Sequence, residues 1–240
     1  MTKIKVIIPN SGMAKATLED REKMLSRAVS SNTVISVNCI DRGPLSVESV
    51  IDEVLVAPEI IRRTINAEDD GHDAVVIYCF SDPGLTAARE AVHIPVVGPG
   101  ETSMAVACML GHRISVITTL TDGVSRVRMR LQQSGFDMSR LSSVRGLDIP
   151  VVNLRENARL TIDRITEVVE IAVAQDGAEV IVMGCLGLAG YGDEAESRFN
   201  VPVIDPSFLA VSTAEMFAKL GIRHSGRTYL HRSMTDVLRR

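Results

Sequence analysis

The sequence predicts an α/β fold made of two lobes, each with a parallel sheet. Two observations lead to this prediction. Short β-branched runs alternate with longer stretches of helical periodicity along the 240 residues, a pattern typical of parallel strands joined by helices. The second half of the chain also repeats the first: in both, an apolar strand, a cysteine, a glycine-bearing turn, a short helix and an X-Pro-Val strand follow one another.

Seven strands are expected, in chain order at 4–8, 34–37, 74–78, 95–97, 114–117, 180–183 and 202–204. Several are apolar at consecutive positions, which indicates strands covered by helices on both faces. Helices are expected between them at 18–29, 50–67 (interrupted near Pro58), 86–91, 102–110, 124–133, 161–174 and 208–220. Gly135 and Gly221 follow two of these helices, at the position where glycine commonly ends a helix.

The repeat defines the expected lobes. Cys79 and Cys185 precede the X-Pro-Val strands of their halves by 15 and 16 positions. We therefore expect a first lobe at 1–99, a second at 100–207, and a C-terminal helix and tail at 208–240 that packs on the first lobe or on a neighbouring subunit. Two flavodoxin-like lobes related by pseudo-two-fold symmetry would bring the carboxyl ends of two sheets together. Open α/β sheets bind ligands there, so we expect the active site in the cleft between the lobes.

Composition argues against several classes of protein. The net charge is −4, and aromatic residues make up only 3% with no Trp, so neither a basic face nor stacking platforms for nucleic acid are expected. No apolar stretch approaches the roughly 18 residues of a membrane span, and the run at 4–8 is too short for a signal-peptide core. The four cysteines form no CxxC pair, which fits a reducing compartment. We expect a cytoplasmic protein.

No metal or organic cofactor is expected. The five histidines share no metal-ligand spacing, and Gly98-Pro99-Gly100 lacks the pattern of a phosphate-binding loop. None of the five lysines ends a later core strand, where a Schiff-base lysine would be expected. The sequence therefore favours a small-molecule substrate handled by side chains alone.

Two cysteines at equivalent places are the candidate catalytic residues. A lone cysteine at a strand end is usually a small core residue, and Cys39 and Cys108 keep that interpretation. Thiols on facing walls of one cleft suit the inversion of an acidic carbon, because one thiolate removes a proton from one face and a thiol returns one from the other. Backbone N–H groups in the turns after Cys79 and Cys185 would favour the thiolate.

The most specific motifs are Cys79-Phe80-Ser81-Asp82-Pro83-Gly84 and Gly184-Cys185-Leu186-Gly187-Leu188. They resemble the aspartate/glutamate/hydantoin racemase superfamily, specifically its hydantoin/allantoin racemase branch, and the similarity extends over nearly the whole chain. The amino-acid racemase branch typically has Asn-Thr and Thr-Glu after its two cysteines, unlike this chain. Two departures from the hydantoin branch are Ile8 where an Asn usually precedes Pro-Asn, and Leu186 and Leu188 in place of Ala and Met.

The resemblance implies a cofactor-independent racemase with Cys79 and Cys185 as its acid/base pair, acting on a 5-substituted hydantoin or allantoin. It further implies a homo-oligomer and a set of substrate-binding residues, namely Asn10, Phe80, Thr118, Thr119, Leu186 and Gly187. On the residues alone, Asn10 could instead cap a turn after Pro9. The threonine pair could likewise cap a helix before Asp122.

Other functions remain open on the sequence. An amino-acid racemase or a maleate-type cis–trans isomerase of the same superfamily would use the same cysteines, and a non-catalytic binding protein could retain the two-lobed shell. The segments expected to face the cleft carry no basic side chain and one acidic one, Asp82. Binding a free amino acid requires basic side chains or several hydroxyl donors to anchor its carboxylates. A neutral ring with amide groups therefore fits these segments better.

Overall fold

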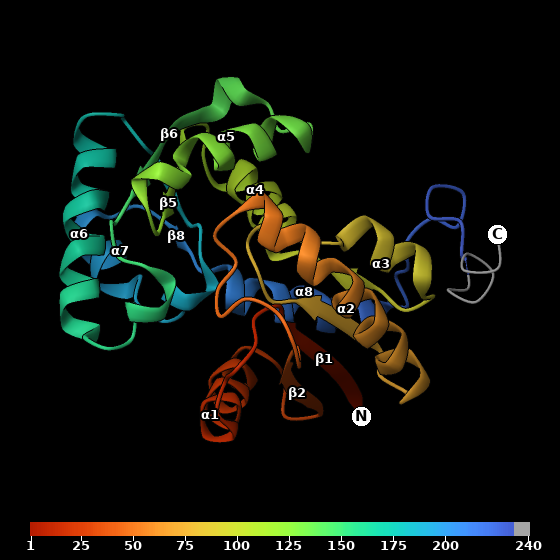
Figure 1. Ribbon diagram of the computed structural model, residues 1–240. Coiled ribbons are helices and arrows are strands. Elements are labelled where there is room, and N and C mark those ends of the chain that lie inside the picture. Colours follow the sequence, from red (N-terminus) through yellow and green to blue (C-terminus); the bar gives the residue numbers. More distant parts are fainter. Residues whose placement is uncertain (233–240) are drawn as a thin grey trace. The chain divides into compact units, whose positions relative to one another are not determined.

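A computed structural model describes residues 1–232, which form two compact units (Figure 1). Unit 1 comprises residues 1–99 and 210–232, and unit 2 comprises residues 100–209. Each unit contains one four-stranded parallel sheet, which confirms the predicted α/β class with two parallel-sheet lobes. Within residues 1–232, no helix is both long enough and apolar enough to cross a membrane.

The sheet of unit 1 has the strand order β2-β1-β3-β4. Its strands are β1 (Thr2–Ile8), β2 (Thr33–Cys39), β3 (Ala74–Ile77) and β4 (Val96–Val97). All neighbours pair in parallel, and Ile7 of β1 lies beside Ile77 of β3. The helices of this unit are α1 (Lys15–Leu25), the 3-10 helix η1 (Ser26–Ala28), α2 (Val50–Asp69), α3 (Leu85–Ala91) and most of α8 (Pro206–Leu220).

Helices α2 and α3 cover one face of this sheet. Ile7 and Ile77 belong to a buried cluster with Val56 and Ile60 of α2 and Leu85 of α3. A capping box starts α2, because the Ser49 hydroxyl accepts from the Asp52 N–H at 3.1 Å and the Asp52 carboxylate accepts from the Ser49 N–H at 2.8 Å. The capping box thereby fixes the residue at which α2 begins.

Unit 2 repeats this topology with the strand order β6-β5-β7-β8. Its strands are β5 (Ile114–Thr118), β6 (Leu141–Gly146), β7 (Val180–Met183) and β8 (Val203–Ile204). Its helices are α4 (Pro99–Leu110), α5 (Val124–Gln133), α6 (Ala158–Ala174) and α7 (Asp193–Phe199). Four 3-10 helices complete the unit, namely η2 (Thr121–Gly123), η3 (Met138–Arg140), η4 (Val151–Asn153) and η5 (Leu186–Leu188). Ile117 and Met183 pack with Ile165 and Val169 of α6 in its core.

Three local features differ from the sequence prediction. Strand β6 was not predicted, because as an edge strand with the sequence Leu-Ser-Ser-Val-Arg-Gly it carries only two apolar residues. Helix α1 begins and ends earlier than its apolar pattern suggested, with η1 completing the segment to residue 28. Helix α2 continues through Pro58 without a break.

Residues 221–232, which follow α8, contact β4 and α3 of unit 1. His224 Nε2 lies 2.9 Å from the backbone nitrogen of Val96 and 3.1 Å from its carbonyl oxygen, while Arg89 Nε donates to that same oxygen at 3.1 Å. Arg89 Nη1 also donates to the Tyr229 hydroxyl at 3.3 Å. Part of the tail expected at 208–240, residues 233–240, lies outside the described residues.

Glu215 joins α8 to the turn that precedes β2. Its carboxylate accepts hydrogen bonds from the Ser30 N–H at 3.0 Å, the Ser30 hydroxyl at 2.7 Å, the Thr33 hydroxyl at 2.5 Å and Lys219 Nζ at 2.8 Å. Partial burial by itself would raise the pKa of Glu215, but the hydrogen bonds from Lys219, Thr33 and Ser30 outweigh it and lower this pKa to about 2.

Replacing Glu215 by Gln should lower the free energy of unfolding by about 1–3 kcal/mol at pH 7. The pKa of about 2 in the folded state lies below the ordinary value of 4.5, so this contribution is present above pH 4.5 and is lost as the pH falls toward 2. Urea unfolding of both proteins at pH 7 and pH 3 measures the difference.

The matched control is Glu19→Gln, which removes an exposed ion pair to Lys15 and should change stability by less than about 0.5 kcal/mol. An effect of Glu215→Gln that is equal at both pH values would contradict the role of its charge.

Candidate active site

Candidate site residues of each unit lie where its two central strands end. In unit 1, Asn10 follows β1 and Cys79 follows β3. In unit 2, Thr118 and Thr119 stand at the end of β5, and Cys185 follows β7. Neighbouring parallel strands end at the same edge of a sheet, so the structure brings Asn10 to the sheet edge that carries Cys79, and the threonine pair to the edge that carries Cys185.

A tight turn holds Cys79 at the start of α3. The Asp82 N–H donates to the Cys79 carbonyl at 3.0 Å, and Asp82 adopts a left-handed φ of 49°. Gly84 begins α3 with a φ of 70°. The half-buried Cys79 Sγ lies 3.2 Å from the Ser81 hydroxyl oxygen. That hydroxyl can donate to a thiolate or accept from a thiol, so it supports either protonation state of Cys79.

Asn10 links two loops at this edge. Its side-chain N–H group donates to the Leu45 carbonyl, 35 residues away, at 2.9 Å, and the neighbouring Ser11 hydroxyl donates to the Gly43 carbonyl at 2.7 Å. This long-range bond differs from the local turn cap considered for Asn10 from the sequence. The Phe80 side chain is buried within the same edge.

Gly98 follows β4 and lies directly against the Cys79 turn. A Cβ atom on Gly98 would lie 2.7 Å from Asp82 Cγ and 2.5 Å from Leu85 Cδ2, closer than packed carbon atoms approach. A larger residue at this position would therefore displace the turn.

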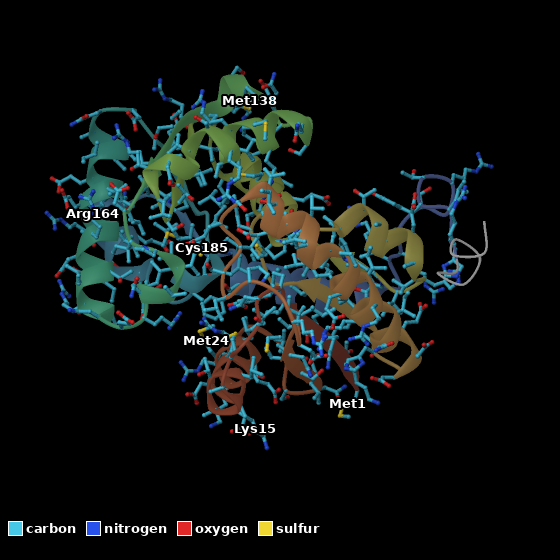
Figure 2. All side chains as sticks on the ribbon, viewed as in Figure 1. Met1, Lys15, Met24, Met138, Arg164 and Cys185 are labelled. Carbon is cyan, nitrogen blue, oxygen red and sulfur yellow. The ribbon has the colours of Figure 1, made fainter. Side chains whose placement is uncertain are left out.

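Cys185, labelled in Figure 2, is the N-cap residue of the 3-10 helix η5 in unit 2. Its Sγ accepts a hydrogen bond from the Gly187 N–H at 3.4 Å. Such a bond to sulfur favours the thiolate. Leu188 belongs to the hydrophobic core with Leu154, and Leu186 is also buried. Leu188, one of the two unusual leucines, is thus a packing residue.

Thr118 and Thr119 are buried at the end of β5. Their carbonyl groups accept from the N–H groups of Leu147 and Ile149 at 3.0 and 3.1 Å, which ties β5 to the segment after β6. The following helix η2 has Leu120 at its N-cap, without a side-chain cap bond. Helix capping, the alternative considered for this pair, is therefore not their role.

Sequence reasoning missed Arg155, which contacts the Cys185 turn. Its Nε donates to the Gly187 carbonyl at 3.1 Å and its Nη2 to the Ala189 carbonyl at 2.5 Å. Arg155 stands in a loop between η4 and α6, with no motif that relates it to a cysteine 30 positions away. Only the folded loop shows the connection.

None of the four cysteines is in a disulfide and all are partly buried, so exposure does not distinguish them. Cys39 ends β2 and Cys108 lies in α4. Unlike these two, Cys79 and Cys185 each follow the third strand of a sheet with the same order. Equivalent positions after the third strand of each sheet therefore distinguish Cys79 and Cys185 from the other two cysteines.

Known proteins resemble this chain over most of its length. A family model described as Asp/Glu/hydantoin racemase matches residues 4–214. Hydantoin racemase of Pseudomonas sp. (strain NS671) is 36% identical over 226 residues, 93% of this chain and 88% of that protein. Hydantoin racemase of Rhizobium meliloti is 36% identical over 218 residues, 91% and 89% of the two chains. Allantoin racemase from Klebsiella pneumoniae has a TM-score of 0.89 at 31% identity and covers 97% of this chain and 94% of its own.

Replacing Gly184 by Ala should lower the free energy of unfolding by about 1–3 kcal/mol. A Cβ atom there would lie 2.9 Å from the Ile117 carbonyl oxygen and 2.9 Å from Val116 Cγ1, so β5 or β7 must shift. Thermal unfolding measures the loss. Gly123→Ala is the control, since its nearest neighbour would be Arg126 Nη2 at 3.5 Å. Equal melting temperatures for the two variants would contradict the close approach.

Proposed function

The chain belongs to the Asp/Glu/hydantoin racemase family, and we propose that it racemises a cyclic ureide with Cys79 and Cys185 as its acid and base. As a racemase it is an isomerase. The proposed substrate is a five-membered ring of the hydantoin or allantoin type, with an acidic hydrogen on the carbon next to a ring carbonyl.

The observation that carries the proposal is the equivalent placement of two thiols. Each cysteine follows the third strand of a parallel sheet, and each has a hydrogen-bonding group next to its sulfur. For Cys185 this group is the Gly187 N–H, and for Cys79 it is the Ser81 hydroxyl. Racemisation needs one base and one acid of the same kind that exchange roles with the direction of reaction. Two similarly placed cysteines meet that need.

The proposed reaction consists of two proton transfers. One thiolate takes the proton from the acidic carbon: the C–H bond breaks, an S–H bond forms, and the electron pair delocalises into the adjacent carbonyl. The second thiol then protonates the other face of the carbon and becomes the thiolate. Each turnover leaves the two sulfurs with exchanged protonation states, so no external reagent is consumed.

Substrate contacts are proposed for Asn10, Phe80, Thr118, Thr119 and Leu186, with backbone N–H groups and hydroxyls facing the ring oxygens. Preorganised donors of this kind stabilise the developing enolate oxygen. The N–H of Gly187, also expected to bind substrate, donates instead to Cys185 Sγ. We therefore assign this N–H to the thiolate.

The absence of basic side chains from segments 10–11, 79–82, 118–119 and 185–187 supports a neutral ring over a free amino acid. An anchored carboxylate needs a guanidinium, an ammonium or several hydroxyl donors. The printed names of the relatives, hydantoin racemase and allantoin racemase, support the same class. Cytoplasmic location, which four cysteines outside any disulfide support, and a homo-oligomer complete the proposal.

Cys79→Ser and Cys185→Ser should each lower kcat/KM for racemisation by at least about 100-fold, because each removes the proton carrier of one face. Each variant should retain hydrogen–deuterium exchange with one enantiomer more than net inversion. Polarimetry and exchange in deuterated water measure the two processes. Cys39→Ser and Cys108→Ser are the matched controls and should keep kcat/KM within about twofold. Wild-type turnover in either of the first two variants would disprove the two-thiol mechanism.

Substrate class is tested by comparing kcat/KM for 5-substituted hydantoins and allantoin with that for aspartate and glutamate. We expect the rings to be preferred by at least about 100-fold, because an unpaired carboxylate among segments that carry no basic side chain costs several kcal/mol. Measurable turnover of the rings would also exclude a purely binding function, because a non-catalytic binding protein would not racemise them. A preference for the free amino acids would overturn the assignment.

A further inference from the structure

Arg155 and the Cys185 turn form a connected set of hydrogen bonds in unit 2. The Arg155 guanidinium donates to the carbonyls of Gly187 and Ala189 at 3.1 and 2.5 Å. It also lies over the Tyr191 ring, 4.6 Å from its centroid. Three contacts thus hold one side chain against the six residues that follow Cys185.

Gly187 is bound on both sides. Its N–H donates to Cys185 Sγ at 3.4 Å, and its carbonyl accepts from Arg155. A Cβ atom on Gly187 would lie 2.8 Å from Leu154 Cδ1, so the residue also packs closely against the neighbour of Arg155. The direction of the N–H toward sulfur therefore depends on how firmly Arg155 and Leu154 hold this glycine.

The loop that carries Arg155 is itself anchored. Leu154 is fully buried, and its carbonyl accepts from the Thr161 hydroxyl of α6 at 2.9 Å. Asn157 caps α6 by accepting from the Leu160 N–H at 3.1 Å. The guanidinium consequently projects from a fixed point, which is the condition for positioning another group.

We propose that Arg155 is a positioning residue that fixes the turn after Cys185, so that the Gly187 N–H stabilises the thiolate of the proposed acid/base pair. The effect of Arg155 on turnover rests on the proposed function. A second charged side chain that contacts this turn is Asp205, whose carboxylate accepts from the Gly190 N–H at 2.8 Å. Arg155 holds the turn near the sulfur, and Asp205 holds its far end.

The test uses the full-length protein and the variants Arg155→Met and Arg155→Lys. Iodoacetamide labels each cysteine at a series of pH values, and peptide mass spectrometry gives the rate at each site. The pH midpoint of Cys185 alkylation should rise by about one pH unit in Arg155→Met, the effect of losing a hydrogen bond to a charged group. Arg155→Lys, which cannot bind two carbonyls in a planar fork, should give a smaller rise. Cys79 in the same sample should keep its midpoint.

Arg140→Met is the matched control. Arg140 also binds two backbone carbonyls of unit 2, those of Cys108 and Gly111, at 2.9 and 2.6 Å, but it does not touch the Cys185 turn in the described residues. The midpoint of Cys185 should stay unchanged in this variant. A general loosening of unit 2 would shift the midpoint in both variants and overturn the proposal.

Turnover separates this inference from the proposed function. With a hydantoin as substrate, Arg155→Met should lower kcat about tenfold while KM changes less than twofold, and its pH–rate profile should move to higher pH. If the wild type racemises no ring, the proposed function fails while the alkylation result still stands. An unchanged Cys185 midpoint in a folded Arg155→Met, or in Arg155→Lys if the former does not fold, would overturn the role of Arg155.

Discussion

Hydrogen bonding between parallel strands is the constraint on which the rest of this protein depends. In each unit the strand before the cysteine, β3 or β7, is buried at every position, as Val76 and Val182 illustrate. The backbone groups of both strands are used in pairing with neighbours on both sides. A strand of this kind has no room for a reactive side chain. Reactive side chains can follow only once such a strand has ended, and Cys79 and Cys185 both stand in the first residues after it.

In both units an aspartate lies between the cysteine turn and the end of the last strand. In unit 1 the aspartate belongs to the turn, and in unit 2 it follows the strand. In unit 1 the acid is Asp82, inside the cysteine turn, and it lies against Gly98 after β4. In unit 2 the acid is Asp205, after β8, and it accepts from Gly190 within the cysteine turn. Gly98 and Asp205 each precede a proline that starts a helix, Pro99 or Pro206. Both units thus have a contact between the cysteine turn and the residue after the last strand. The carboxylate comes from the turn in unit 1 and from the residue after the strand in unit 2.

Much of this arrangement could be predicted from the sequence, because buried strands leave continuous apolar runs and repeated turns leave repeated glycines. Both cysteines, the strands that precede them and the polar residues after β1 and β5 follow from that pattern. Strand β6 could not be predicted, since an edge strand needs little apolar surface. Arg155 and the contact of Gly98 with Asp82 could not be predicted either. They depend on distances between loops, and local periodicity carries no information about those distances.

His224 has a consequence for how the folded chain behaves at high concentration. Strand β4 forms one border of its sheet, where an unpaired N–H and C=O would invite a strand from another molecule. The neutral imidazole can accept from the Val96 N–H while Arg89 donates to the Val96 carbonyl, so two side chains occupy the groups that such a strand would use. Residues 221–232 thereby hinder edge-to-edge aggregation at β4. A protein shortened before His224 would expose the edge of this strand.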